Sequence, residues 1–371
     1  SMAAIMITGS HIPADRNGLK FYTPSGEISK ADEENILAAR GLGPAGQNAE
    51  AKPADFLGDY IDRYVTGFGP DALNGLRIGV YQHSSVAREI MITIVERLGG
   101  VAVPLGWSDT FIPVDTEAVD PETREQLAAW CSTNELDALI STDGDADRPM
   151  LTDAEGRVVP GDVLGPLTAQ SLHADIVVTP VSSNTLVYQM GFAQVIPTQI
   201  GSPFVVAGIE SAQGKVIGYE ANGGFLLGNT ATGPSGELAP LMTRDCMLPI
   251  IAPLALAKAK GISMADLVLT LPKRFTAANR IIGIDSDVSR RFLEELSNDA
   301  TKRAAFFECG SPETATDTTD GLRVTFDDDV MHLRPSGNAP EFRCYTEASS
   351  QSRAEELLNT HLEKLKGVLT A

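Results

Sequence analysis

The 371-residue sequence has no long hydrophobic run, few cysteines and little positive charge, and each shortage excludes a class of protein. No apolar stretch approaches the roughly 18 residues that a membrane-spanning helix needs, and the start lacks the basic segment of a signal peptide. The four cysteines lie far apart and include no Cys-x-x-Cys pair. This spacing fits neither a zinc site nor a disulfide framework and favours a reducing cytoplasm.

Basic residues are outnumbered, because 29 Lys and Arg face 49 Asp and Glu, for a formal net charge of −20. Such a surface repels nucleic acid and anionic membranes, so neither is expected as a partner. It also repels a sugar phosphate, which would therefore need a locally positive cleft. A high net charge equally serves solubility alone. The sequence does not reveal the oligomeric state, and monomer and homodimer both stay open.

Strand-like and helix-like segments alternate, which predicts an α/β protein. Ser29 and Asp32 form a capping-box pattern at the start of a helix that ends at Gly41. Another helix is expected over residues 86–98. Short strands that end in polar turns are expected over 3–8, 76–82, 137–141, 174–180 and 215–219.

The C-terminal part has a different pattern and predicts an α+β domain. Residues 288–307 and 352–368 are expected to be helical. Strands are expected over 322–333 and 342–346. Segments containing Pro and Gly place domain boundaries near 55, 160 and 271, giving domains 1–55, 56–160, 161–271 and 272–371.

Asp143, Asp145 and Asp147 alternate in Asp-Gly-Asp-Ala-Asp-Arg, so an extended loop would turn their carboxylates the same way. Carboxylates packed so closely repel each other unless a cation lies among them, and oxygen-only ligands select Mg²⁺ or Ca²⁺ over zinc. An EF-hand is excluded because Arg148 and Ala154 stand where it needs Gly and Glu. A solvated acidic turn is the structural alternative.

Ser10 follows an apolar strand in the segment Thr-Gly-Ser-His-Ile-Pro. A serine hydroxyl is a weak nucleophile unless it is activated, and a cation between the aspartates and a phosphoryl group on Ser10 would neutralise charge in a loose transition state. His11 and Lys20 lie close in sequence and could orient phosphate or move protons. Taken alone, Ser10 is typical of a turn or helix cap.

Two further loops carry groups that recognise sugars and phosphates. Glu220 and Asn222 precede a Gly-Gly pair, and together they could grip two adjacent sugar hydroxyls, although an Asn-Gly hairpin tip is the alternative. An arginine beside a Ser-Gly turn offers a forked guanidinium and backbone amides to a phosphate. The residues of this second loop are Arg334, Ser336, Gly337 and Asn338, with Arg343 as a second cation.

In this order and at these separations, the four loops resemble those of the α-D-phosphohexomutase superfamily, and most of all its bacterial phosphomannomutase/phosphoglucomutase branch. The matches run from Thr8 to about Arg343. The resemblance implies three related α/β domains, the first incomplete, and a TATA-binding-protein-like fourth domain around a central cleft. It implies that Ser10 carries the phosphoryl group and joins the three aspartates as a ligand of Mg²⁺, and that Lys20, His11 and Arg148 complete the catalytic group.

The activity that the resemblance implies is reversible transfer of a phosphoryl group between C6 and C1 of a hexose phosphate, with mannose phosphate preferred. A hexose 1,6-bisphosphate would be both intermediate and activator. A glucose or glucosamine phosphate mutase is the nearest alternative, although the sugar loop lacks the Gln-Ser-Gly-His form of the glucosamine branch. A catalytically weak sugar-phosphate binding protein is another, and a phosphatase would need a water-positioning group that the sequence does not show.

The sequence departs from the family pattern at two places. Only residues 1–8 and Gly9 precede Ser10, where members of the family carry a further stretch, so Ile5, Met6 and Ile7 are expected to be exposed and the chain to be a poor catalyst. Gly224 stands where many members have a histidine that is discussed as a proton carrier. The sequence does not show which group replaces it.

Overall fold

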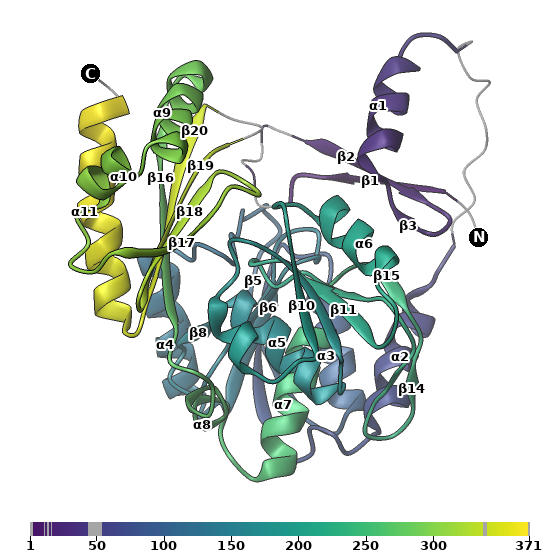
Figure 1. Ribbon diagram of the computed structural model, residues 1–371. Coiled ribbons are helices and arrows are strands. Elements are labelled where there is room, and N and C mark those ends of the chain that lie inside the picture. Colours follow the sequence, from purple (N-terminus) through teal and green to yellow (C-terminus); the bar gives the residue numbers. More distant parts are fainter. Residues whose placement is uncertain are drawn as a thin grey trace. The chain divides into compact units, whose positions relative to one another are not determined.

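The computed structural model describes residues 3–10, 12, 15, 17–43, 54–336 and 340–369 (Figure 1). The chain divides into two compact units. Unit 1 comprises Ser1–Thr179, Met190–Ile196 and Gly201–Thr270, and unit 2 comprises Pro180–Gln189, Pro197–Ile200 and Leu271–Ala371. No helix within the described ranges is long and apolar enough to cross a membrane. The predicted division into four domains with boundaries near 55, 160 and 271 stays a prediction.

Unit 1 begins with a small antiparallel sheet and one helix. Its elements are β1 (Ala4–Thr8), β2 (Gly18–Thr23), β3 (Gly26–Glu27) and α1 (Lys30–Ala38). The side chain of Ser29 accepts a hydrogen bond from the backbone of Asp32, and the reciprocal bond is also present, so the predicted capping box is confirmed. Ile5 and Ile7 are 59% and 70% exposed, as expected, whereas Met6 between them is half-buried, because alternate side chains of a strand point to opposite faces.

The second sheet of unit 1 has the strand order β5-β4-β6-β7-β8. Its strands are β4 (Arg77–His83), β5 (Val101–Trp107), β6 (Ala138–Thr142), β7 (Pro149–Thr152) and β8 (Val158–Val159). The accompanying helices are α2 (Leu57–Phe68), α3 (Arg88–Arg97) and α4 (Pro121–Thr133). β5, β4 and β6 are parallel, whereas β7 returns antiparallel to β6. Buried side chains such as Tyr81, Leu127 and Leu139 pack α4 against one face.

The third sheet has the order β10-β9-β11-β12-β15. Its strands are β9 (Ile176–Pro180), β10 (Gln194–Thr198), β11 (Val216–Tyr219), β12 (Phe225–Leu227) and β15 (Leu241–Asp245). The other elements of unit 1 in this part of the chain are α5 (Gly161–Ser171), α6 (Ser202–Ser211), β13 (Ala231–Thr232), β14 (Glu237–Leu238), α7 (Leu248–Lys260) and α8 (Met264–Leu269), whereas η1 (Thr185–Gln189) belongs to unit 2. β9 and β11 are parallel and β12 returns antiparallel, as in the second sheet. In both sheets a hairpin loop therefore follows the carboxyl end of a parallel strand, where ligands bind in open α/β sheets.

Unit 2 contains an antiparallel sheet in the order β16-β20-β19-β18-β17 with helices packed on it. The strands are β16 (Phe275–Ile282), β17 (Glu313–Asp317), β18 (Leu322–Phe326), β19 (Asp329–Pro335) and β20 (Glu341–Ala348). The helices are α9 (Ser286–Asn298), α10 (Ala300–Phe307) and α11 (Gln351–Leu369). In Figure 1 α11 lies along this sheet, and the predicted α+β character is confirmed.

Two segments of unit 2 that are each expected to form one element form two elements instead. The helix expected over 288–307 is interrupted at Asp299, whose side chain accepts from the backbone N–H groups of Thr301 and Lys302 and so begins α10. The strand expected over 322–333 is a hairpin that turns at Asp327, where φ is +25°. A capping aspartate and an Asp-rich turn are sufficient physical reasons for both interruptions.

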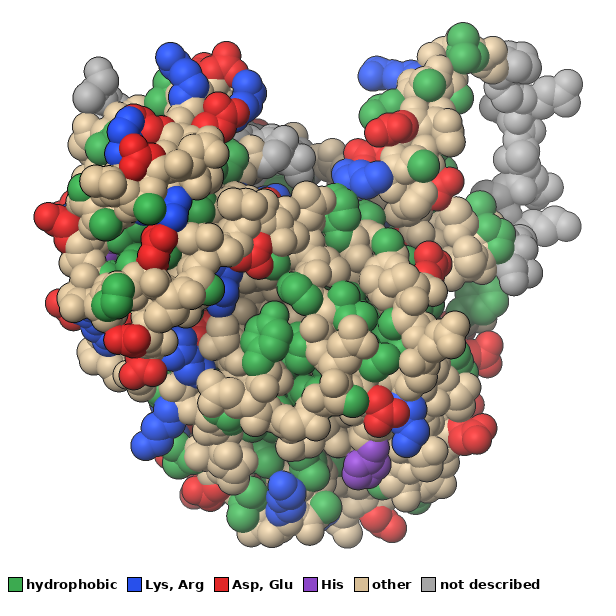
Figure 2. Space-filling view, in the orientation of Figure 1, with side chains coloured by type: hydrophobic (Ala, Val, Ile, Leu, Met, Phe, Trp, Pro, Cys, Tyr) green, Lys and Arg blue, Asp and Glu red, His purple; other side chains and the backbone are tan. Residues whose placement is uncertain are grey.

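Charged side chains of both signs are interspersed on the face drawn in Figure 2. Many form exposed ion pairs, such as Arg97 with Asp62 at 2.9 Å. Exposed pairs of this kind contribute little to stability. Other basic side chains are largely buried, such as that of Arg244, which is only 12% exposed.

Candidate active site

The loop between β6 and β7 carries the acidic motif, and one of its own carboxylates holds its shape. Oδ1 of Asp143 accepts hydrogen bonds from the backbone N–H groups of Asp147 and Arg148, each at 3.2 Å. Burial, followed by the charges of Asp147 and Asp145, raises the pKa of Asp143 to about 7. Asp143 is 0% exposed, so the loop is a buried, ordered structure and not a solvated turn.

The other two aspartates complete a cluster, as their alternating spacing predicts. One carboxylate oxygen from each of Asp143, Asp145 and Asp147 lies within 4.8 Å of the others. Oδ1 of Asp145 and Oδ1 of Asp147 are buried and have no hydrogen-bond partner among the residues that the structure describes. Buried carboxylate oxygens without partners are costly, and hard divalent cations take oxygen ligands of this kind. The three residues therefore fit a divalent cation.

Lys20 on β2 contacts the same cluster across 125 residues of sequence. Its ammonium group donates to Oδ2 of Asp145 and, at 2.5 Å, to Oδ2 of Asp147. Burial opposes ionisation of Asp145, but the hydrogen bond and charge of Lys20 lower the pKa of Asp145 to about 2. The small N-terminal sheet thus places the predicted lysine among the predicted metal ligands.

Ser10 lies in the turn after β1 and meets the acidic loop. Its Oγ donates a hydrogen bond to Oδ2 of Asp143 at 2.7 Å. Its φ of +45° lies in the left-handed region that non-glycine residues rarely adopt. A Cβ on Gly144 would lie 2.5 Å from the carbonyl oxygen of Ser10, so only glycine lets the acidic loop approach this backbone. The structure therefore brings together the predicted phosphoserine and the predicted metal ligands.

Arg148 ends the acidic loop and adds positive charge to the cluster. Its Nε lies 3.9 Å from Oδ2 of Asp143 and 3.8 Å from Oδ1 of Asp147. At these distances the guanidinium offsets part of the repulsion between the carboxylates. The other expected member of the catalytic group, His11, lies outside the described residues.

The loop between β11 and β12 is a hairpin tip with buried polar groups. The backbone N–H of Gly223 donates to the carbonyl of Glu220 at 2.8 Å, and Oδ1 of Asn222 accepts from the backbone of Gly224 at 3.0 Å. Glu220 is 6% exposed, and its Oε2 has no hydrogen-bond partner in the described part of the chain. Burial raises the pKa of Glu220, against the influence of nearby arginines. One acceptor oxygen in this loop is therefore available for a hydroxyl donor.

Arg244 on β15 joins the acidic loop to the hairpin loop, and the sequence analysis did not identify it. Its guanidinium lies 2.9 Å from Asp147 and 3.6 Å from Glu220. Its Nε also donates to Glu27, the last residue of β3, at 3.2 Å. The available signal was a charged residue inside an otherwise mostly apolar stretch, residues 241–247. That signal does not identify the residues that Arg244 contacts, because their carboxylates come from three segments that are distant in the sequence.

The predicted phosphate loop lies in unit 2, where Asp320 anchors its arginine. Nε of Arg334 donates to Oδ1 of Asp320 at 2.6 Å, and Oδ2 of Asp320 accepts from the backbone of Ile200 at 2.9 Å. The backbone N–H of Ser336 donates to the carbonyl of Glu341 at 2.8 Å. A bond through Nε fixes the guanidinium and leaves its terminal nitrogens able to meet an anion. Two other members of this loop, Gly337 and Asn338, lie outside the described residues.

Three arginines stand side by side across the sheet of unit 2. Arg343 on β20 pairs in register with Arg334 on β19 and with Arg280 on β16. Like charges directly opposite each other destabilise a sheet unless anions accompany them. Glu341 supplies one compensating negative charge. Its carboxylate oxygens lie 3.6 Å from Nε of Arg280 and 3.5 Å from Nη2 of Arg343. The row favours an anion site here and adds Arg280, which the sequence analysis missed because it lies outside the phosphate-loop motif.

Four family models for the domains of phosphoglucomutase/phosphomannomutase match the chain. Those described as α/β/α domains I, II and III match residues 1–40, 59–156 and 160–275. The C-terminal domain matches residues 293–363. The chain therefore belongs to the phosphoglucomutase/phosphomannomutase family of the α-D-phosphohexomutase superfamily, as its motifs indicated.

Individual relatives agree with this assignment. A phosphomannomutase of Sinorhizobium fredii is 43% identical over 372 residues, covering 96% of this chain and 78% of the relative. A phosphomannomutase of Salmonella muenchen is 41% identical over 374 residues, covering 99% and 78%. A phosphoglucomutase/phosphomannomutase family protein from Burkholderia thailandensis shares the fold, with a TM-score of 0.76 at 19% identity over 99% of this chain and 76% of that one.

Proposed function

We propose that the chain is a phosphohexomutase that moves a phosphoryl group between C6 and C1 of mannose phosphate. The observation that carries the proposal is the 2.7 Å hydrogen bond from Ser10 to Asp143, which places a hydroxyl at a buried cluster of carboxylates. The names of the relatives at 43% and 41% identity support mannose as the sugar.

Asp143, Asp145 and Asp147, together with a phosphoryl oxygen on Ser10, would hold Mg²⁺. When bound, this cation would neutralise charge on the transferring phosphoryl group. Two ligand oxygens are available for the cation, because Oδ1 of Asp145 and Oδ1 of Asp147 are buried acceptors without hydrogen-bond partners in the described ranges. Lys20 and Arg148 would keep the net charge of the cluster low and orient the phosphoryl oxygens, and His11, which follows Ser10 in the sequence, would assist them.

In the proposed transfer, the bond from phosphorus to Oγ of Ser10 breaks while a bond from phosphorus to the free sugar hydroxyl forms. The ammonium group of Lys20 donates one proton to Oγ of Ser10 as that bond breaks, and the resulting amine takes one proton from the sugar hydroxyl, so charge and protons balance. The hexose 1,6-bisphosphate then returns its other phosphoryl group to Ser10, which leaves the isomeric monophosphate.

The remaining residues would bind the substrate in both of its orientations. Glu220 and Asn222 would hold sugar hydroxyls, because a buried carboxylate oxygen and an amide serve as acceptor and donor. The phosphate that does not react would be bound by Arg334, Ser336, Gly337, Asn338 and Arg343. The two phosphate positions exchange when the intermediate turns over.

A coupled assay tests this function. The protein is incubated with mannose 1-phosphate or glucose 1-phosphate and Mg²⁺, with and without hexose 1,6-bisphosphate, and the 6-phosphate product is measured. We expect mannose 1-phosphate to be isomerised faster, with stimulation by the bisphosphate. Faster conversion of glucose 1-phosphate would reassign the sugar, and no isomerisation of either would contradict the proposal.

Arg334→Ala should weaken phosphate binding more than it slows turnover. A charge-assisted hydrogen bond contributes about 1.5–3 kcal/mol, so we expect KM for mannose 1-phosphate to rise by roughly tenfold to a hundredfold. Arg290→Ala is the matched control, because this arginine of α9 is exposed and pairs with Asp287 of the same helix. An unchanged KM in Arg334→Ala, measured by steady-state kinetics, would contradict the assignment.

Gly161→Ala should displace the sugar loop. A Cβ at Gly161 would lie 2.3 Å from the backbone N of Gly223 and 2.5 Å from the carbonyl carbon of Asn222. Because a shift of about 1 Å can reduce catalysis by about a hundredfold, we expect a marked loss of kcat/KM. Gly58→Ala in α2 is the control, since its added methyl meets nothing within 4 Å. Wild-type kinetics in the Gly161 variant would show that the loop does not act on the sugar.

A further inference from the structure

The stem of Arg244 fills the space that a side chain at position 224 would need. A Cβ on Gly224 would lie 2.9 Å from Cδ of Arg244 and 3.0 Å from its Cγ. The carbonyl oxygen of Asp147 would lie 3.1 Å away. The methylene carbons of a buried arginine cannot move aside cheaply, because the packed interior leaves few voids. Glycine at 224 and arginine at 244 are therefore a matched pair.

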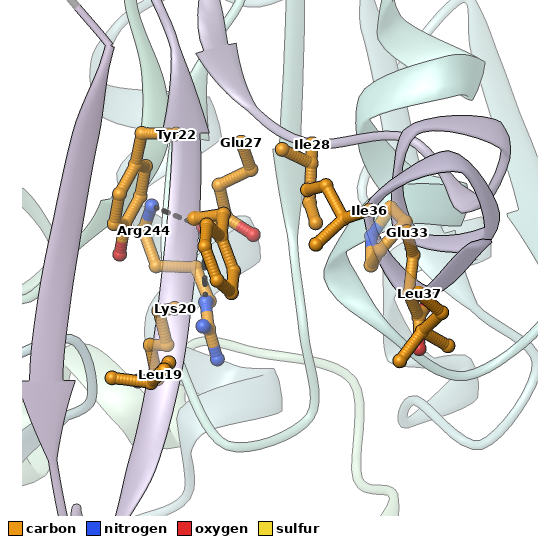
Figure 3. Close-up of a pocket in the computed structure, with 11 residues that line it drawn as sticks. Leu19, Lys20, Tyr22, Glu27, Ile28, Glu33, Ile36, Leu37 and Arg244 are labelled. Carbon is orange, nitrogen blue, oxygen red and sulfur yellow. Dashed lines mark hydrogen bonds and ion pairs between the residues drawn. The ribbon is translucent and has the colours of Figure 1, made fainter. Parts of the chain in front are cut away.

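The head of Arg244 lies among three carboxylates from three segments of unit 1. Nη2 is 2.9 Å from Oδ2 of Asp147, Nη1 is 3.6 Å from Oε2 of Glu220, and Nε is 3.2 Å from Oε1 of Glu27. Figure 3 shows Arg244 beside Lys20 and Glu27, with a dashed line to Glu27. Although burial disfavours the cation, the carboxylates, Asp147 first, keep the pKa of Arg244 above its usual value.

We propose that Arg244 is a positioning residue that takes the place of the side chain missing at Gly224 and fixes the sugar loop relative to the metal loop. The inference rests on the proposed function and extends it to a residue that no motif contains. The methylene carbons of Arg244 exclude a side chain at position 224. Its guanidinium group contacts one carboxylate of each loop, Asp147 in the metal loop and Glu220 in the sugar loop.

The energetics favour a positioning role over simple packing. Oε2 of Glu220 is buried and has no hydrogen-bond partner within the described chain, and its charge is compensated by nearby guanidinium groups, that of Arg244 more than that of Arg148. Removing one member of a buried ion pair leaves an uncompensated charge, which is strongly destabilising. Without Arg244, the carboxylates of Glu220, Asp147 and Glu27 would repel one another. We expect the sugar loop to move away from the metal loop, because it is the shorter and more glycine-rich of the two.

A double-mutant cycle tests the steric link without requiring turnover. Hydrogen–deuterium exchange is measured over residues 143–148 and 216–227 in metal-free wild-type protein, Gly224→Ala, Arg244→Ala and the double variant. Gly224→Ala alone should deprotect both loops by displacing the arginine. It should add little in the Arg244→Ala background, since coupled neighbours are not additive. Equal effects of Gly224→Ala in the two backgrounds would overturn the inference.

Steady-state kinetics separate positioning from packing. Arg244→Lys keeps the charge and most of the side-chain methylenes, whereas Arg244→Met keeps only an apolar chain of similar length and leaves the three carboxylates uncompensated. Circular dichroism therefore first checks that each variant is folded. We expect the methionine variant to raise KM for mannose 1-phosphate about tenfold or more, and the lysine variant to recover part of this loss. Arg97→Ala, which removes an exposed arginine paired with Asp62, should match wild type. Identical kinetics for the lysine and methionine variants would overturn the inference.

The two experiments fail in distinguishable ways. If wild-type protein isomerises no hexose phosphate, the proposed function is wrong, and the exchange cycle alone decides whether Arg244 holds the loops together. If wild-type protein is active and Arg244→Met retains its KM and its exchange pattern, the function stands and the role of Arg244 is wrong.

Discussion

Ser10→Ala protein is expected to lose mutase turnover by a factor on the order of 10⁴ or more, as enzymes with a covalent intermediate do when their nucleophile is removed. The carboxylates around Ser10 are no substitute for its hydroxyl, because they are the proposed ligands of the cation and Oδ2 of Asp147 already accepts from Lys20. The hydroxyl lies 2.7 Å from Asp143, on a residue with a φ of +45°. Alanine accepts that conformation no worse than serine, so the fold should persist.

Intact mass and phosphorus NMR after incubation with a hexose 1,6-bisphosphate measure directly whether Ser10 becomes phosphorylated. Wild-type protein should gain one phosphoryl group, and Ser10→Ala none. Ser25→Ala is the control, since Ser25 is an exposed hydroxyl in the same small sheet that bonds to Thr23 at 2.8 Å. Normal turnover in Ser10→Ala would rule out the covalent mechanism.

The local parts of the site were predictable because short-range chemistry determines them. Period-two spacing places Asp143, Asp145 and Asp147 in one cluster. The capping box at Ser29 is an interaction between residues three apart. Such features need no knowledge of the tertiary fold, and the structure agrees with each of them.

The parts that escaped prediction depend on contacts between distant segments. Glu27 and Arg244 are 217 residues apart at their backbone contact, and nothing beside either residue indicates the other. Arg280 joins the arginine row only through strand register, which hydrophobic pattern alone does not fix for an exposed face. The interruption of the expected helix at Asp299 is a local feature, and its capping side chain was a signal that could have been used.

Asp145→Asn is expected to weaken Mg²⁺ binding and to slow turnover by about tenfold to a thousandfold, since a bound metal supplies several kcal/mol of transition-state stabilisation. The change keeps the shape of the side chain but removes one charge from the cluster. It also weakens the link to Lys20, whose ammonium bonds to Asp145 and Asp147. The proposed proton carrier would then keep the charge of only one of these two aspartates, Asp147, beside it, so turnover should fall even at saturating Mg²⁺.

Calorimetric titration of metal-free protein with Mg²⁺, followed by rates across a range of Mg²⁺ concentrations, separates these two effects. Weaker affinity with full recovery at high Mg²⁺ would mean that Asp145 acts only as a ligand. A residual deficit at saturation would show that it also positions Lys20. Asp62→Asn, an exposed carboxylate paired with Arg97, should change neither quantity. Full activity of wild-type protein in a chelator would exclude a metal-dependent mechanism. The buried oxygens of Asp145 and Asp147 would then need an explanation other than metal binding.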